Sequence, residues 1–189
     1  MIVYIHGFNS NGVGSKYTEL VGMFPDIEIF SPSYDSSDFS SIDSMIDEIG
    51  NKISDSDNTL FIGCSLGGYL AQYLAKHFNS KSILLNPCYD PQGFLSTQLG
   101  ENILYSERRG YDLTMENVRI LEKYEVSPTQ RGETNIIVFT NKDDDTIPYE
   151  GVVNYYRDRP VGIFETGSHR FTNLEDIKND IIESYNSAF

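Results

Sequence analysis

Two separated segments of the chain carry the side chains that acyl transfer by a serine nucleophile requires. Ser65 is the central residue of Gly63-Cys64-Ser65-Leu66-Gly67, which matches the G-x-S-x-G pattern of a sharp turn between a strand and a helix. A serine hydroxyl needs a base to accept its proton. His169 follows the last predicted strand and is the candidate base. The competing interpretation is a tight glycine turn with a surface serine and an unrelated loop histidine.

An acidic loop offers a third catalytic group. Asp143, Asp144 and Asp145 follow a predicted strand and precede Thr146-Ile147-Pro148. The resulting chain order of serine, aspartate and histidine is one in which such triads occur, and the carboxylate would orient the imidazole. The residues alone leave the choice among the three aspartates open. Solvated charge or a weak cation site is the alternative interpretation of this loop.

The segment His6-Gly7-Phe8, after the first predicted strand, would complete the site. We expect the backbone N–H groups of Phe8 and Leu66 to converge on a developing oxyanion. Loss of one such donor usually costs on the order of 2.7–4 kcal/mol of catalysis. His6 is expected to support this loop rather than to transfer protons.

Strands and helices must alternate along the chain to hold these segments. Short apolar runs predict strands over 2–5, 27–30, 60–62, 83–85, 136–139 and 162–164. Helical patterns cover 15–24, 39–49, 66–78, 149–157 and 174–185, with Thr172 or Asn173 as the cap of the last helix. This alternation predicts an α/β fold: an about six-stranded, mainly parallel sheet with helices on both faces. We expect one domain over residues 1–189.

Residues 88 to about 131 interrupt the alternation and contain no predicted strand. Residues 100–131 carry a net charge of −1, whereas residues 1–99 carry −7 and residues 132–189 carry −6. We interpret residues 88–131 as a short helical cap inserted over the site, and we refer to them as the insert. Arg108, Arg109 and Tyr111 of the insert are candidate substrate contacts, although paired arginines in a polar stretch are more often solvated.

Composition narrows the function classes. The 189 residues include 14 Lys and Arg against 28 Asp and Glu, a net charge of −14 that disfavours binding to nucleic acid. Two cysteines and three histidines make neither a disulfide framework nor a four-ligand zinc site, and we expect no metal and no cofactor. No apolar run resembles a signal peptide or a membrane span. We therefore expect a cytoplasmic protein without stable membrane insertion, and the sequence leaves its oligomeric state open.

A glycine-rich loop suggests nucleotide binding as a different class of function. Gly12-Val13-Gly14-Ser15-Lys16 enters a predicted helix, where backbone N–H groups can bind phosphate. The segment lacks the contiguous G-K-[ST] of a phosphate-binding loop, which argues against this interpretation.

Together these segments resemble the α/β-hydrolase superfamily, and more closely the small YqiA/YcfP-type esterases. The resemblance covers nearly the whole chain. It rests on His6-Gly7, Gly63 to Gly68, Asn86-Pro87, Leu99-Gly100-Glu101-Asn102, the acidic loop ending in Ile147-Pro148, and Gly167-Ser168-His169-Arg170-Phe171. One departure is Asn141, which stands where such hydrolases often carry glycine.

The resemblance implies a minimal α/β-hydrolase fold that cleaves a small-molecule acyl ester or thioester through Ser65, His169 and an aspartate. The related acidic loops resemble Asp-x-x-[IV]-Pro, which favours Asp144; Asp145 is the second candidate and Asp143 is expected to face solvent. Because fold does not guarantee activity, a catalytically silent binding or regulatory protein is the alternative.

Overall fold

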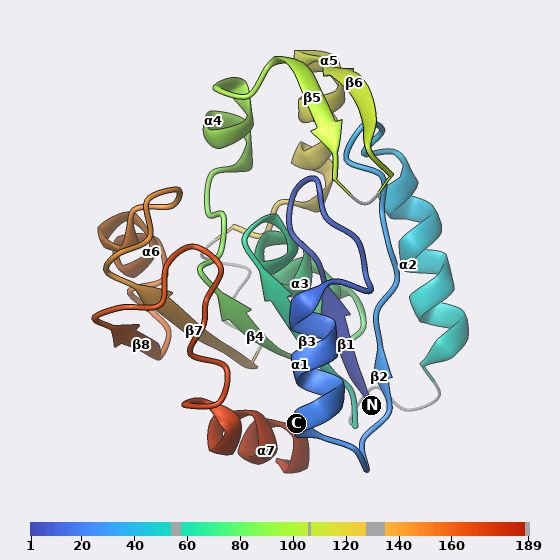
Figure 1. Ribbon diagram of the computed structural model, residues 1–189. Coiled ribbons are helices and arrows are strands. Elements are labelled where there is room, and N and C mark those ends of the chain that lie inside the picture. Colours follow the sequence, from blue (N-terminus) through green and yellow to red (C-terminus); the bar gives the residue numbers. More distant parts are fainter. Residues whose placement is uncertain (54–57, 106, 128–134, 188–189) are drawn as a thin grey trace.

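A parallel six-stranded sheet forms the centre of the molecule (Figure 1). The computed structural model describes residues 1–53, 58–105, 107–127 and 135–187. The strand order is β2-β1-β3-β4-β7-β8, and all five pairings are parallel. The strands are β1 (Ile2–Ile5), β2 (Ile29–Phe30), β3 (Leu60–Cys64), β4 (Lys81–Leu85), β7 (Asn135–Asn141) and β8 (Val161–Phe164). The predicted α/β fold is confirmed.

Successive side chains of the central strands enter two separate hydrophobic cores. In β1, Val3 and Ile5 pack into one core, whereas Ile2 and Tyr4 pack into the other. This alternation follows from the two-residue period of a strand. Strands buried on both faces read as continuous apolar runs, which is why they are visible in the sequence.

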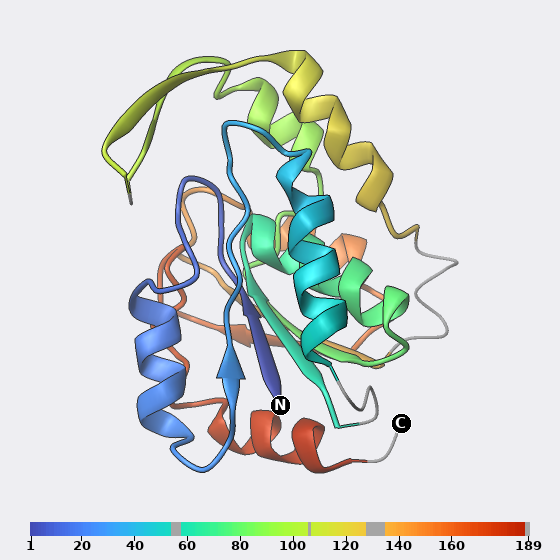
Figure 2. The ribbon, with the colours of Figure 1, turned by 90° about the vertical axis from the view of Figure 1, so that its right-hand side faces the viewer.

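Helices cover both faces of the sheet (Figure 2). The helices are α1 (Ser15–Met23), α2 (Ser41–Lys52), α3 (Leu66–His77), α6 (Tyr149–Tyr155) and α7 (Lys178–Asn186). Apolar residues of α1 and α7 contribute to one core, and those of α2, α3 and α6 contribute to the other. The two cores hold the sheet between the helices. Because its strands are parallel, the loops at their carboxyl ends meet at one edge, where open α/β sheets bind ligands.

The insert differs from the prediction because it contains strands. Its described part holds α4 (Pro91–Ser96), β5 (Gly100–Leu104), β6 (Arg109–Leu113), α5 (Met115–Arg119) and the 3₁₀ helix η1 (Ile120–Tyr124). β5 and β6 pair as an antiparallel hairpin, so the expectation of an insert without strands is wrong. Most hairpin side chains are exposed or half-buried, and the segment therefore lacks the apolar runs that reveal the central strands. Residues 106 and 128–131 of the insert lie outside the described residues.

The last helix begins later than expected. α7 starts at Lys178, and the chain forms turns over residues 174–177 instead of a first helical turn. Neither Thr172 nor Asn173 caps it, and the Asn173 amide donates to Asp176 Oδ2 at 3.0 Å. None of the helices in the described residues combines the length and the apolar composition needed to cross a bilayer.

Candidate active site

Ser65 lies in a strained turn between β3 and α3. Its backbone has φ 57° and ψ −123°, in the left-handed region that a non-glycine residue rarely adopts. A Cβ atom on Gly63 would lie 2.0 Å from the carbonyl oxygen of Gly67, and one on Gly67 would lie 2.1 Å from that of Ile5. Both glycines are therefore required by close backbone contacts, as the G-x-S-x-G pattern predicts.

A chain of hydrogen bonds joins Ser65 to His169 and Asp144. The Ser65 Oγ atom lies 3.0 Å from His169 Nε2, and His169 Nδ1 lies 2.8 Å from Asp144 Oδ2. A carboxylate only accepts hydrogen bonds, so Nδ1 carries the imidazole proton in this arrangement and Nε2 is free to accept the serine proton. The structure thus brings together the three side chains expected from the sequence.

The three neighbouring aspartates have different partners. The Asp144 side chain is fully buried, and its Oδ1 also accepts from the backbone N–H groups of Thr146 and Ile147, both at 2.9 Å. Asp145 is exposed and accepts from the Thr146 hydroxyl at 3.1 Å. Tertiary contact therefore distinguishes Asp144, which alone of the three pairs with the imidazole in the described structure.

Asp143 is exposed, as expected, yet its carboxylate is not directed only at solvent. It accepts from the backbone N–H groups of Gly167 at 3.2 Å and Ser168 at 2.8 Å. Ser168 adopts φ 54° and Gly167 adopts φ 150°. These two bonds therefore hold the strained loop that carries His169, a function that the sequence did not indicate.

Two buried asparagines also hold the His169 loop. The side-chain amides of Asn86 and Asn141 both donate to the carbonyl oxygen of Ser168 at 2.9 Å. The Asn141 backbone N–H in turn donates to Asn86 Oδ1 at 2.9 Å. Two features of the sequence indicated these residues. Asn86-Pro87 directly follows β4, and Asn141 stands where related hydrolases often carry glycine.

The loop after β1 lies against the Ser65 turn. A Cβ atom on Gly7 would lie 3.3 Å from the Ser65 Cβ. Among the described residues, no hydrogen bond within the protein uses the backbone N–H of Phe8 or of Leu66. Both groups are therefore available to a substrate oxygen.

His6 is a buried support of this loop. Its Nδ1 donates to the Gly7 carbonyl oxygen at 2.8 Å, and its Nε2 accepts from the Tyr34 backbone N–H at 3.3 Å. The Tyr34 ring stacks on the imidazole with centroids 4.3 Å apart. Burial lowers the pKa of His6 to about 4, so the ring is neutral at physiological pH.

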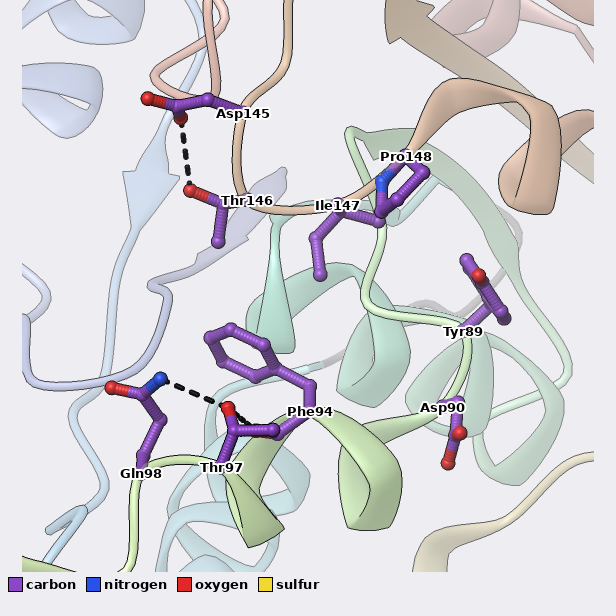
Figure 3. A pocket seen from close by; sticks show the side chains of 9 residues that line it. All are labelled: Tyr89, Asp90, Phe94, Thr97, Gln98, Asp145, Thr146, Ile147 and Pro148. Carbon is purple, nitrogen blue, oxygen red and sulfur yellow. Dashed lines mark hydrogen bonds between the residues drawn. The ribbon is translucent and has the colours of Figure 1, made fainter.

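An open cavity of about 970 Å³ surrounds the Ser65 and His169 side chains. A second cavity of about 460 Å³ shares Phe94, Asp145 and Thr146 with it. Figure 3 shows the Ile147 side chain directed toward Phe94 of α4, and both residues line this second cavity. Its lining contains the carboxylates of Asp90 and Asp145 and no basic side chain among the described residues.

The other candidate contacts lie elsewhere. Arg108, Arg109 and Tyr111 line neither cavity. Arg109 forms ion pairs with Asp35 at 2.8 Å and Glu107 at 2.9 Å.

Lys16, from the glycine-rich loop, is buried, and its ammonium group already has partners within the protein. Its Nζ donates to the Phe171 carbonyl oxygen and pairs with Glu19, both at 2.8 Å. A phosphate would have to displace both partners, so the structure gives no support to a nucleotide site at this loop.

Comparisons with known proteins agree with this architecture. Est1E from Butyrivibrio proteoclasticus superposes with a TM-score of 0.69 at 16% identity, covering 96% of this chain and 85% of Est1E. The mouse alpha/beta hydrolase domain-containing protein 10 gives 0.71 at 17% identity, covering 96% of this chain and 89% of the mouse chain. At these identities the likeness establishes the shared fold.

Sequence relatives point to a single family. A UPF0227 protein from Shewanella loihica is 30% identical over 101 residues, which are 49% of this chain and 53% of that protein. One from Shewanella woodyi is 28% identical over 116 residues, 57% of this chain and 62% of that protein. The matched segments thus span less than two thirds of these relatives' lengths. The model of the Uncharacterised protein family UPF0227 matches residues 1–185, and the chain therefore belongs to this family and has the α/β-hydrolase fold.

Proposed function

We propose that this protein is a serine hydrolase that cleaves a small-molecule acyl ester or thioester. The observation that carries the proposal is the hydrogen-bond chain from Ser65 Oγ to His169 Nε2 at 3.0 Å and from His169 Nδ1 to Asp144 at 2.8 Å. A nucleophile, a base and an orienting carboxylate in this geometry are the requirements for covalent acyl transfer.

Acylation begins when Ser65 Oγ attacks the substrate carbonyl carbon while its proton moves to His169 Nε2. The carbonyl oxygen becomes an oxyanion that accepts hydrogen bonds from the N–H groups of Phe8 and Leu66. Asp144 remains ionised and stabilises the imidazolium through Nδ1. His169 then gives its proton to the departing alcohol or thiol as the bond to the acyl carbon breaks.

Deacylation repeats these steps with water in place of serine. His169 Nε2 accepts a proton from water, whose oxygen attacks the acyl carbon of the ester on Ser65. Collapse of the second oxyanion releases the carboxylic acid, and the imidazolium returns the proton to Ser65 Oγ. All proton transfers pass through the one imidazole nitrogen that faces Ser65.

The second cavity favours an uncharged, compact group on the substrate. Phe94 and Ile147 provide apolar surface in its lining, and the acidic residues of the lining, Asp90 and Asp145, disfavour an anion. Arg109, one of the candidate substrate contacts, is already paired with two carboxylates. We therefore propose esters or thioesters that place an uncharged group in the second cavity.

Labelling by a fluorophosphonate probe, followed by mass spectrometry of the modified peptide, tests the proposal. We expect one label on Ser65 and hydrolysis of short aryl esters. Ser65→Ala should abolish labelling and lower kcat on the order of 10⁶-fold. Wild-type protein that neither takes up the probe nor hydrolyses these esters would instead identify a catalytically silent binding protein on the hydrolase fold.

A further inference from the structure

Asn9 occupies an unusual position next to the candidate oxyanion donor. It directly follows Phe8, is 6% exposed and has φ 58°. Its backbone N–H donates to the hydroxyl of fully buried Ser36 at 2.9 Å. A residue in the left-handed region persists there only when its surroundings hold it.

The surroundings that hold Asn9 include the β5–β6 hairpin of the insert. The Tyr111 hydroxyl of β6 donates to Asn9 Oδ1 at 2.7 Å, and Asn9 Nδ2 donates to Asn102 Oδ1 of β5 at 3.3 Å. The backbone N–H of Tyr105, just after β5, donates to the Asn9 carbonyl oxygen at 3.3 Å. Figure 2 shows the hairpin arching over the loop between β1 and α1.

The hairpin is itself fastened beside Ser36. Arg109 of β6 pairs with Asp35 at 2.8 Å and donates to the Ser37 hydroxyl at 3.2 Å. Burial raises the pKa of Tyr111 to about 12, so its hydroxyl keeps the proton that it donates to Asn9. Asn9 is thus hydrogen-bonded both to the β5–β6 hairpin and to Ser36. The hairpin is in turn bonded to Asp35 and Ser37, the neighbours of Ser36.

We propose that Asn9 and Tyr111 are positioning residues that set the direction of the Phe8 N–H toward the oxyanion. This inference rests on the proposed function. Asn9 is fixed by bonds at its N–H, its carbonyl and its side chain. Its neighbour Phe8, whose N–H belongs to the preceding Gly7–Phe8 peptide, is thereby held on its C-terminal side. An oxyanion donor must lie within about 2.7–3.1 Å of the oxygen, and a displacement of about 1 Å can cost on the order of 100-fold in rate. Tyr111 therefore acts through the loop rather than as a substrate contact.

Tyr111→Phe is the primary test because it removes one hydroxyl and keeps the ring. We expect kcat for a short aryl ester to fall about 10-fold to 100-fold, with KM changed less than about twofold. Phenylboronic acid forms a tetrahedral adduct with a serine nucleophile, in which a boron-bound oxygen stands in for the oxyanion. Its inhibition constant should rise by the same factor as kcat/KM falls.

Two further variants separate positioning from general damage. Asn9→Gly accepts the positive φ but loses both side-chain bonds, and should lose at least as much activity as Tyr111→Phe. Asp112→Asn alters an exposed neighbour of Tyr111 on the same strand, and the Asp112 side chain makes no hydrogen bond in the described structure. This control should retain wild-type kcat and wild-type boronate inhibition.

Hydrogen–deuterium exchange provides a readout that does not require catalysis. Amides of residues 8–12 should exchange faster in Tyr111→Phe than in the wild type or in Asp112→Asn. Unchanged exchange in this segment would overturn the positioning role, as would a lower melting temperature with unaltered kcat and boronate inhibition. Absence of hydrolysis and probe labelling in the wild type would refute the proposed function instead, and the exchange measurement would still decide whether Tyr111 holds the loop.

Discussion

Replacing Asp144 by asparagine changes one oxygen for an NH₂ group at the buried end of the hydrogen-bond chain. Asp144 Oδ1 accepts from the N–H groups of Thr146 and Ile147 and lies 3.0 Å from His169 Nδ1, whereas Oδ2 lies 2.8 Å from the same nitrogen. In the variant, the amide oxygen remains the only acceptor for the two backbone donors, so the NH₂ group faces the imidazole. A protonated Nδ1 would then oppose an N–H donor at the closer, 2.8 Å position, which favours the tautomer whose Nδ1 accepts a hydrogen bond and whose proton is on Nε2. A protonated Nε2 has no lone pair for the proton of Ser65.

The alternative amide orientation restores the active tautomer but opposes an NH₂ group to two N–H donors. Each buried donor left unsatisfied costs about 1–3 kcal/mol, so this orientation is disfavoured by about 2–6 kcal/mol in total. Since about 1.36 kcal/mol corresponds to a tenfold change, the active form is populated about 30-fold to 10⁴-fold less. We expect kcat to fall within this range, and asparagine at the acid of another Ser-His-Asp triad costs about 10⁴-fold.

The assay is steady-state hydrolysis of a short aryl ester by Asn variants at all three aspartates. Circular dichroism and the melting temperature serve as controls for folding. Asp145→Asn should lose less than about threefold, because the Asp145 carboxylate receives only the Thr146 hydroxyl in the described structure and a surface contact of this kind contributes little. Near-wild-type turnover by Asp144→Asn together with collapse at Asp145 would refute the assignment of Asp144.

Three further predictions follow from single contacts. Cys64→Ala should keep kcat/KM within about threefold, because burial raises the pKa of the Cys64 thiol to about 12 and the inert thiol is not the nucleophile; a variant as inactive as Ser65→Ala would show that the nucleophile is misassigned. Burial also lowers the folded-state pKa of His6 from 6.5 to about 4, so the unfolded chain binds the extra proton and His6 should destabilise the fold as pH falls below about 6.5, by about 2 kcal/mol at pH 5. Urea unfolding at pH 7.5 and pH 5 measures this, and His6→Asn with the same pH dependence as the wild type would contradict it. Asp143→Ala removes the acceptor for the loop that carries His169 and should lower kcat about 10-fold, whereas Asp143→Asn keeps an acceptor oxygen and should lose less; equal activity of both variants and the wild type would exclude this role.

Local patterns account for what the sequence determined. The central strands read as apolar runs because both faces of the sheet are buried, and the order of the elements followed from their alternation. The Ser65 turn was recognisable because two close backbone contacts demand glycine on either side. His169 was identified by its place after the last strand, since parallel strands bring their carboxyl ends to one edge.

Contacts between distant segments decided the remainder. The residues alone left three adjacent aspartates open and the resemblance favoured Asp144. The folded chain pairs Asp144 with an imidazole 25 residues away. Tyr111 bonds to Asn9 across 102 residues, and the exposed hairpin that makes this bond has no apolar pattern of its own. The spacing of apolar residues in a sequence predicts which side chains are buried, but not which residues they contact. A hydrogen bond between two distant polar groups depends on how all the elements between them pack.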